Sequence, residues 1–325
     1  MISKVAKVGI LVRTKNRNLT LDQALKGLVG QTFGDWHIRL LNDGGDGAAV
    51  RETVAKYKDV LAGRISIYDN EKSVGRGGAL AQLLNYARED YILIHDDDDT
   101  IEPAFLMTTV AVLDDASNDH CCAVVTSNYD VHATIDGSDI RVLQTVAESG
   151  KKPDSYVDFM DFMKARFGLF TTNSCLFRRK VATPYTHIIS DMNYHEDKAL
   201  FKYMMLEGDF KTIEPHLSSY YHYQDVNKEY SQTNAFNENA GILENNHNMR
   251  EAIKNSDGMS RFTCMLQDSR RNKDAEEMLM VTVYQNLFQA MEKKHENTLQ
   301  SLQAMVKAFQ ALSTKIDMLE NKIKS

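Results

Sequence analysis

The sequence has few of the residues that cross-link, stiffen or anchor a chain. Of its 325 residues only four are cysteines and four are prolines, and the cysteines lack the C-x-x-C spacing of metal or redox motifs. We therefore expect reduced, mostly buried thiols in a cytoplasmic protein. No apolar run approaches the ~18 residues that a transmembrane helix needs, so the sequence predicts no membrane span.

Positive charge is outnumbered by negative charge, with 38 Lys and Arg residues against 45 Asp and Glu. The formal net charge is −7 and no basic cluster stands out, which argues against a nucleic-acid partner. The N-terminal stretch MISKVAKVGILVRTKNR holds a strand-length apolar segment without a small-residue cleavage site, so we expect no signal peptide. Any association with a membrane is expected to be peripheral, at its inner face.

The first half of the chain alternates short apolar runs with helical patterns. This alternation predicts right-handed βαβ units, and hence an α/β fold with a mostly parallel sheet flanked by helices. The expected strands are 7–12, 36–41, 64–68, 91–94 and 122–127, and the expected helices are 19–29, 50–60, 75–87 and 105–113.

Four consecutive aspartates, Asp96 to Asp99, follow a strand-like apolar run in the stretch YILIHDDDDTIEP. Adjacent carboxylates repel one another, so such a cluster is costly unless solvent or a cation neutralises it. Open α/β sheets bind ligands at the carboxyl ends of their strands, and Mg²⁺ prefers oxygen ligands. The stretch therefore predicts a divalent metal site. The alternative is a solvated acidic loop that caps the next helix, with Asp99 or Thr100 as N-cap.

Two further polar loops follow predicted strands, at residues 13–16 (RTKN) and 42–44 (NDG). Because parallel strands end at one edge of a sheet, we expect these loops to converge with the aspartates. The helix start at residues 75–78 (GRGG) has free N–H groups that favour anions, so Arg76 could face a diphosphate. Each loop alone is more typical of an ordinary turn than of a binding site.

Taken in order, these blocks resemble an inverting family-2 glycosyltransferase with the GT-A fold. VGILVRTKNR is similar to the family's opening strand, and QTFGDWHIRLLNDGGDG to its next strand and loop, with Asn42 in place of the first aspartate. Residues 70–87 are similar to its helix after the third strand, and YILIHDDDDTIEP to its DXD motif. The resemblance covers about residues 5–225.

The resemblance implies roles for matching residues at the sheet edge. Asp98 would bind Mn²⁺ or Mg²⁺, which offsets charge on the leaving nucleoside diphosphate. His222, in the aromatic stretch EPHLSSYYHYQD, is a candidate further metal ligand, although such a histidine is more often packed or at the surface. The residues implied to bind the nucleotide-sugar are Thr14, Asn16, Asp43, Arg76, Asp96 and Asp97.

A second motif, YHEDKAL at residues 194–200, resembles the family's Glu-Asp pair at a helix start. The resemblance implies that Asp197 is the general base that removes the proton of the acceptor hydroxyl, with Glu196 as the alternative base. Acidic residues at a helix N-terminus are also consistent with simple stabilisation of the helix dipole. The segment before it, residues 168–180, resembles a segment that lies near the acceptor.

The last segment differs in kind. From Val281 to Ile323 apolar residues recur at alternating steps of three and four over about six heptads. This pattern predicts a C-terminal coiled-coil helix and a homo-oligomer, with a helical hairpin folded onto the catalytic domain as the alternative. We expect a catalytic domain at 1–230, a helical, polar connector at 231–270 and the coiled coil at 271–325.

The sequence thus predicts a metal-dependent transferase that moves a sugar from a nucleotide-sugar, by default UDP-linked, to a hydroxyl of a glycan or lipid-linked glycan. A sugar-phosphate nucleotidyltransferase is a second candidate, but its Gly-rich basic loop would stand where this chain has RTKNR. A third candidate is a non-catalytic coiled-coil scaffold with a degenerate transferase domain. The chain retains four carboxylates that a degenerate domain would be expected to lose, and these argue against the scaffold: Asp43, Asp97, Asp98 and Asp197.

Overall fold

A computed structural model of the chain describes residues 5–134, 140–146, 155–164, 169–192 and 195–224. The predicted connector and coiled coil therefore lie outside the described residues. None of the helices in the described ranges combines the length and the hydropathy that a membrane span requires.

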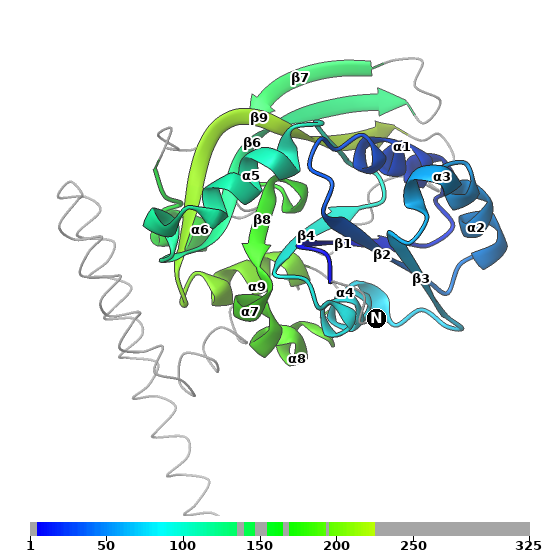
Figure 1. The fold of residues 1–325 in the computed structure, drawn as a ribbon, viewed down its shortest axis with the longest axis horizontal. Helices are drawn as coiled ribbons and strands as arrows, with labels where there is room; N and C mark the ends of the chain where they lie inside the picture. Colours follow the sequence, from blue (N-terminus) through cyan, green and yellow to red (C-terminus); the bar gives the residue numbers. More distant parts are fainter. Residues whose placement is uncertain (1–4, 135–139, 147–154, 165–168, 193–194, 225–325) are drawn as a thin grey trace, which may run out of the picture. The chain divides into compact units, whose positions relative to one another are not determined.

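Nine strands of the described chain form one sheet, in the order β3-β2-β1-β4-β8-β6-β9-β5, with β7 paired to β6 (Figure 1). The strands are β1 (Val8–Thr14), β2 (Trp36–Asp43), β3 (Ile65–Asn70), β4 (Tyr91–Asp96), β5 (Thr100–Ile101), β6 (Cys121–Thr134), β7 (Ile140–Val146), β8 (Cys175–Arg178) and β9 (Asp209–Gln224).

The sheet is mixed, so the prediction of a mostly parallel sheet holds only for its first half. Strand β1 pairs in parallel with β2 and β4, and β2 with β3. Beyond β4 the only parallel pair among the described strands is β6 with β9, whereas β8, β7 and β5 pair antiparallel to their neighbours. The strand–helix alternation that predicts parallel pairing ends near residue 127, and the antiparallel strands β7 and β8 follow it.

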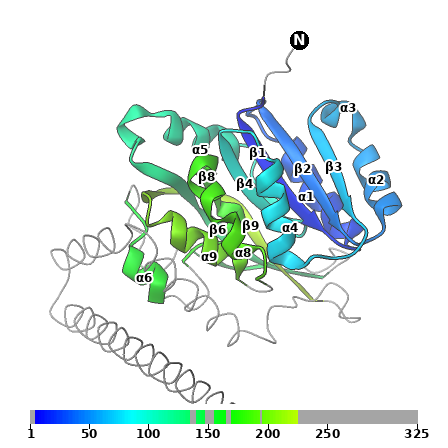
Figure 2. The same cartoon turned by 90° about the horizontal axis from the view of Figure 1, so that it is seen from below.

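The helices cover both faces of the parallel half, with α1 on one face and α4 on the other (Figures 1 and 2). The helices are α1 (Asn18–Val29), α2 (Gly47–Ala55), α3 (Lys58–Leu61), α4 (Gly75–Tyr86), α5 (Phe105–Asp114), α6 (Phe159–Lys164), α7 (Arg179–Ala182), α8 (Thr186–Ile189) and α9 (Glu196–Met204). Three 3₁₀ turns complete the described structure: η1 (Ala116–Asn118), η2 (Thr172–Ser174) and η3 (Thr183–Tyr185).

The second helix begins three residues earlier than predicted and ends at Ala55. The Asp46 side chain accepts hydrogen bonds from the backbone N–H groups of Ala48 and Ala49, which is an N-cap that starts the helix at Gly47. The rest of the predicted 50–60 helix is the separate short helix α3.

The main core lies between the sheet and the helices α1, α2 and α5. Val8, Ile10 and Val12 of β1 pack into one buried cluster with leucines of α1 and with Phe105 of α5. Because successive strand residues point to opposite faces, Arg13 points to the other side, where α4 covers the sheet. Its Nη1 donates to the backbone carbonyl of Arg76 in α4 at 3.0 Å.

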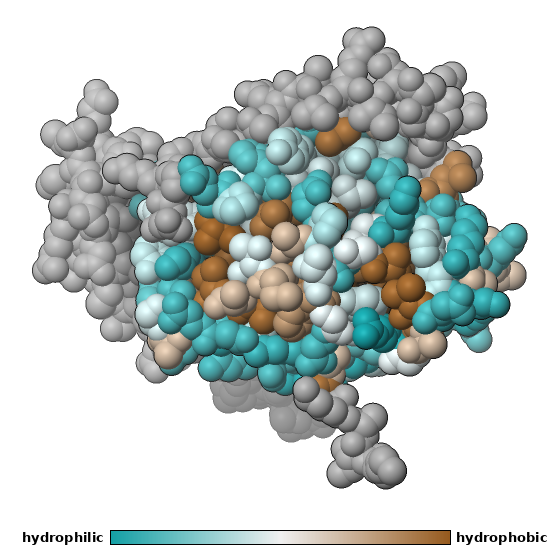
Figure 3. Space-filling model, turned by 45° about the horizontal axis from the view of Figure 1, so that its top comes forward, coloured by the Kyte–Doolittle hydropathy of each residue, from teal (hydrophilic) through white to brown (hydrophobic). Residues whose placement is uncertain are grey.

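A close backbone approach holds α4 against α8. The N–H of Gly77 donates to the carbonyl of Met192 at 3.1 Å, and a Cβ at Gly77 would lie 2.0 Å from the carbonyl oxygen of Ile189. The glycines at the start of α4 therefore have a packing role. On the face seen in Figure 3, apolar surface is broken up and rimmed by hydrophilic side chains.

Candidate active site

The register of β1 and β4 sets the first contact of the site. Arg13 and Asp96 are register partners at the carboxyl ends of these neighbouring parallel strands, so their side chains leave the same face of the sheet. Arg13 Nη2 donates to Asp96 Oδ1 at 2.7 Å. This contact lies on the face that α4 covers.

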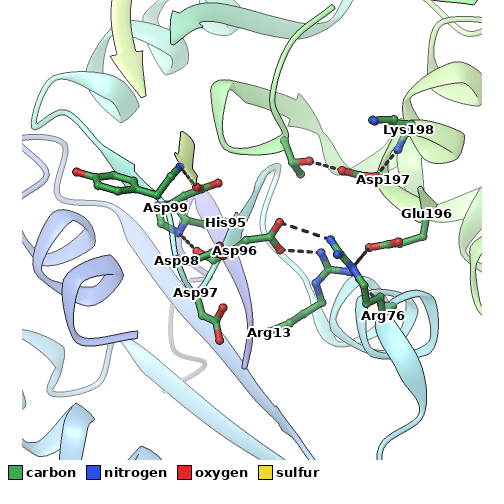
Figure 4. Close-up of polar contacts among 12 residues, drawn as sticks. Arg13, Arg76, His95, Asp96, Asp97, Asp98, Asp99, Glu196, Asp197 and Lys198 are labelled. Carbon is green, nitrogen blue, oxygen red and sulfur yellow. Dashed lines mark hydrogen bonds and ion pairs between the residues drawn. The ribbon is translucent and has the colours of Figure 1, made fainter. Parts of the chain in front are cut away.

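The same arginine reaches the predicted catalytic pair, although the two lie 183 residues apart in the sequence. Arg13 Nη1 donates to Glu196 Oε1 at 2.5 Å, and Arg76 Nε donates to the same oxygen at 3.3 Å. Arg76 Nη2 also lies 3.9 Å from Asp96 Oδ2. We call Arg13, Arg76, Asp96 and Glu196 the arginine–carboxylate network (Figure 4).

The two arginines keep Asp96 charged. Burial raises the pKa of the Asp96 carboxyl, but the charges of Arg13 and Arg76 outweigh it and hold that pKa well below its usual range. Glu196 is fully buried, so the two guanidinium groups supply the countercharge that water cannot. The network thus ties the sheet edge to the start of α9.

Asp97 and Asp98 have a different partner. Figure 4 shows Asp96 turned toward the two arginines and Asp97 turned away from them. Arg17, which directly precedes α1, donates to Asp97 Oδ1 at 3.0 Å and to Asp98 Oδ2 at 2.6 Å. Burial, together with the charge of Asp98, raises the pKa of Asp97 against the opposing effect of Arg17. The second oxygen of Asp97 is buried and has no hydrogen-bond partner among the described residues.

Asp99 and His95, which flank the acidic residues 96–98, hold the loop and the strand in place. Asp99 is buried and accepts a hydrogen bond from the backbone N–H of Tyr221 at 3.0 Å, which joins the acidic loop to β9. His95 is fully buried, and its Nδ1 donates to the carbonyl of Asp96 at 2.9 Å. Burial lowers the pKa of His95 to about 4, so the ring is neutral, as expected of a packed histidine.

Asp43 lies at the predicted edge, and its side chain orders the loop between β3 and α4. Its two oxygens accept hydrogen bonds from Asn70 Nδ2, Ser73 Oγ and the backbone N–H groups of Val74 and Gly75 at 2.6–3.2 Å. Burial raises the pKa of Asp43, but these four bonds outweigh it and keep that pKa below its usual value. Four bonds use the accepting capacity of a carboxylate.

Two more predicted residues flank this edge. Asn16 adopts a left-handed backbone conformation (φ 55°), and its side-chain oxygen accepts a hydrogen bond from the N–H of Asp46 at 2.8 Å. Thr14 is buried, and its hydroxyl has no hydrogen-bond partner within the described part of the chain. The loops after β1 and β2 therefore meet, as the sequence predicts.

Asp197 differs from Glu196 in access to solvent. It is half-buried, and its oxygens accept hydrogen bonds from the Thr172 hydroxyl and from the backbone N–H of Lys198. Burial raises the pKa of Asp197, but Lys198, Arg76 and the bond from Thr172 outweigh it, so the pKa lies below its usual value. His195 before it has φ 57°, an uncommon conformation for a non-glycine residue that turns the chain into α9. An ionised, accessible carboxylate can accept a proton from a bound hydroxyl.

His222, the second predicted metal ligand, lies in β9 next to Tyr221, whose backbone N–H donates to Asp99. Its Nε2 is 3.5 Å from Asp130 Oδ1, and its ring contacts that of Tyr220 edge-on. No group of three or more His, Cys, Asp or Glu side chains is arranged to hold a metal within the described ranges. The remaining donors still fit Mg²⁺ or Mn²⁺, because such ions often take one or two carboxylates and complete their shell with water and phosphate oxygens. The unpartnered oxygen of Asp97 and the partly exposed carboxylate of Asp98 are such donors.

Three residues of the site were not among the predicted ones: Arg13, Arg17 and Thr172. A sequence signal existed for the two arginines, since RTKNR follows a predicted strand at the edge where the four aspartates are expected. Buried carboxylates need countercharges, and this stretch supplies two. Thr172 lies in the segment 168–180, which resembles a segment near the acceptor, but the sequence does not single out this residue; its contact with Asp197 comes from the tertiary structure.

A family model and a related protein both link this chain to glycosyltransferases. A model of Glycosyl transferase family 2 matches residues 10–182, which is more than half of the chain. The protein EpsE of Bacillus subtilis (strain 168), which carries a glycosyltransferase name, is 27% identical over 111 residues, 33% of this chain and 38% of EpsE.

Solved structures share the fold. TarS 1–349 of S. aureus superposes with a TM-score of 0.52 at 16% identity, over 66% of this chain and 60% of TarS. Its complex with UDP-GlcNAc gives a TM-score of 0.54 at 14% identity, over 70% and 62%. The chain thus spans less than two thirds of the length of each of these relatives, and the structural likeness concerns the fold.

Proposed function

The chain belongs to glycosyltransferase family 2, and we propose on this premise that it is an inverting, metal-dependent glycosyltransferase. It would move a sugar from a nucleotide-sugar to a hydroxyl of a glycan or lipid-linked glycan. One observation carries the proposal: a half-buried, ionised Asp197 lies beside a buried network that connects it to the acidic edge of the sheet.

The acidic edge supplies the donor side of the reaction. Asp97 and Asp98 would hold a divalent cation and the nucleotide-sugar, while Thr14, Asn16 and Arg76 line the same edge. The cation, when bound, offsets negative charge on the leaving diphosphate. Asp43 would act through the loop that it orders, because all its hydrogen-bonding capacity is used there. His222, which pairs with Asp130, would complete the metal shell or contact the diphosphate.

Asp197 is the better candidate for the general base. Glu196 is fully buried, and one of its oxygens already accepts hydrogen bonds from two arginines. Asp197 keeps part of its surface accessible, and its depressed pKa leaves it ionised at neutral pH. In the proposed reaction Asp197 takes the proton of the acceptor hydroxyl as the oxygen attacks the anomeric carbon from the face opposite the leaving group. Arg13 and Arg76 would hold Glu196, and Glu196 would thereby fix the start of α9 and the position of Asp197.

A uridine diphosphate sugar is the first donor to test, because TarS was crystallised with UDP-GlcNAc. We further propose, from the sequence patterns alone, a cytoplasmic enzyme that associates with itself through the C-terminal heptads.

Calorimetric titration with a panel of nucleoside diphosphates, with and without Mn²⁺, tests the donor site. We expect one nucleotide to bind only with Mn²⁺, and Asp98→Ala to abolish that binding. Asp59→Ala, an exposed aspartate on α3, is the matched control and should bind normally. Absence of binding by every nucleotide would favour the scaffold, and release of pyrophosphate from a nucleoside triphosphate and a sugar phosphate would favour a nucleotidyltransferase.

The general base is tested separately. Asp197→Asn should keep the nucleotide affinity and lower kcat by a factor on the order of 10² to 10⁴, as expected for loss of a proton acceptor. A turnover close to that of the wild type would remove the assignment of Asp197.

A further inference from the structure

Arg17 occupies the two carboxylates that the proposed donor site needs. Its Nη1 lies 3.0 Å from Asp97 Oδ1 and its Nη2 lies 2.6 Å from Asp98 Oδ2, so a single guanidinium bridges both side chains. The bridge is shielded from water, since the side chains of Arg17, Asp97 and Asp98 are 25%, 4% and 13% exposed. Among the described residues Arg17 is the cation that forms ion pairs with both carboxylates.

This arrangement opposes binding of a metal to the two oxygens that Arg17 contacts, Asp97 Oδ1 and Asp98 Oδ2. An arginine stays charged at any pH that a protein tolerates, so it cannot leave by losing a proton. A guanidinium and a hard cation that share the same carboxylate oxygens also repel each other. A divalent ion that binds Asp98 through Oδ2, or through both oxygens, must therefore first break the contact with Arg17.

The bridge leaves hydrogen-bonding groups of Arg17 and Asp97 unused. This indicates that the Arg17 side chain can adopt a second position in which they are used. Its Nε is buried and has no hydrogen-bond partner among the described residues, and Asp97 Oδ2 lacks one as well. A buried donor and a buried acceptor without partners cost free energy that a ligand can recover. The planar guanidinium matches the geometry of phosphate oxygens, and a cation on Asp98 would bring the diphosphate to this edge.

We propose that Arg17 is an internal counter-cation that holds Asp97 and Asp98 in the free protein and exchanges with the divalent ion on donor binding, turning its guanidinium to the diphosphate. This inference rests on the proposed function, because it concerns the same site. The exchange makes metal and nucleotide bind cooperatively. Metal alone displaces Arg17 from its carboxylates and leaves the guanidinium without a new partner. Metal and diphosphate together give Arg17 the phosphate oxygens as a new partner.

The first test is a titration of the full-length protein with Mn²⁺ alone, with free Mn²⁺ measured by electron paramagnetic resonance. Arg17→Gln should bind Mn²⁺ at least ~10-fold tighter than the wild type, the size expected when a charge-assisted bond no longer has to be broken. Arg51→Gln, which removes an exposed arginine of α2 paired with Asp69, should leave the affinity unchanged. Equal Mn²⁺ affinity of Arg17→Gln and wild type would overturn the proposal.

The second test is titration with UDP at saturating Mn²⁺. Arg17→Gln should bind UDP about 10-fold more weakly than the wild type, because the contact with the diphosphate is lost. Unchanged UDP affinity would refute the turn of Arg17 toward the phosphates. If Arg17→Gln does not fold, Arg17→Met serves, since it also removes the positive charge and should raise the Mn²⁺ affinity in the same way.

The two proposals can fail separately. Tighter binding of Mn²⁺ by Arg17→Gln, combined with no nucleoside diphosphate binding by any variant, would support the counter-cation and refute the transferase. Metal-dependent nucleotide binding by the wild type, with the same Mn²⁺ affinity in Arg17→Gln and wild type, would support the transferase and refute the counter-cation.

Discussion

Replacement of Arg13 by Met should destabilise the fold strongly, because this side chain neutralises two carboxylates at once. Arg13 is 8% exposed and donates to Asp96, to Glu196 and to the carbonyl of Arg76. Methionine fills a similar apolar volume but supplies no charge and no donor. Glu196, which is fully buried, would then depend on Arg76 Nε at 3.3 Å alone.

The expected cost follows from the burial of the two acids. Removal of one partner of a buried ion pair typically costs about 3–5 kcal/mol, because the other charge stays buried without compensation. Asp96 is 23% exposed at its side chain, so water replaces part of its lost partner. Arg76 also retains one contact with Glu196. We therefore expect a loss of about 3 kcal/mol in the free energy of unfolding, near the lower end of that range.

The assay is urea denaturation followed by the fluorescence of Trp36. This residue is the only tryptophan in the chain, lies in β2 and is 2% exposed, so its emission reports unfolding of the sheet. Arg51→Met is the matched control: its exposed pair with Asp69 should cost at most about 1 kcal/mol.

A double variant separates charge compensation from packing. If Arg13 acts by neutralising Glu196, then Arg13→Met with Glu196→Gln should be more stable than the sum of the two single losses predicts, by about 1–3 kcal/mol. A loss below about 1 kcal/mol in Arg13→Met, or strictly additive losses in the double variant, would refute the reasoning.

Three further predictions concern other parts of the chain. Gly77→Ala places a Cβ 2.0 Å from the carbonyl oxygen of Ile189, so the melting temperature should fall by several degrees in a calorimetric scan, and an unchanged value would contradict the close packing of α4 on α8. Burial raises the pKa of Glu89, but hydrogen bonds from Arg39 and the backbone outweigh it and hold that pKa below its usual value. Because this pKa is depressed, ionised Glu89 stabilises the fold at pH values above its unfolded pKa of about 4.3, and this stabilisation is lost as the pH falls below it. In Glu89→Gln the free energy of unfolding should therefore decrease less steeply with falling pH than in the wild type. The same acid dependence in both proteins would exclude a stabilising role of the Arg39–Glu89 pair. Deletion of residues 272–325 should lower the oligomeric state in light scattering if the heptads associate, and an unchanged mass distribution would exclude that role.

The sequence by itself determined the parallel half of the sheet and the chemistry at its edge. Hydrophobic periodicity identifies β1 to β4 and their helices, since these segments alternate apolar strands with helical patterns at short spacing. The loops after β1, β2 and β4 then have to meet, because parallel strands end on the same side. This reasoning locates Thr14, Asp43 and the four aspartates without any coordinates.

Only the tertiary structure decided what each carboxylate does. Asp43 orders a loop, Glu196 is compensated by two arginines and Asp197 keeps access to solvent, although all three are acidic residues in family-like motifs. Their side-chain partners lie 25 to 183 residues away, and register and packing bring them together. Burial and counter-ions set the charge and reach of a side chain, and neither can be read from a local sequence motif. The antiparallel strands of the second half escaped prediction for the same reason: their pairing depends on distant neighbours.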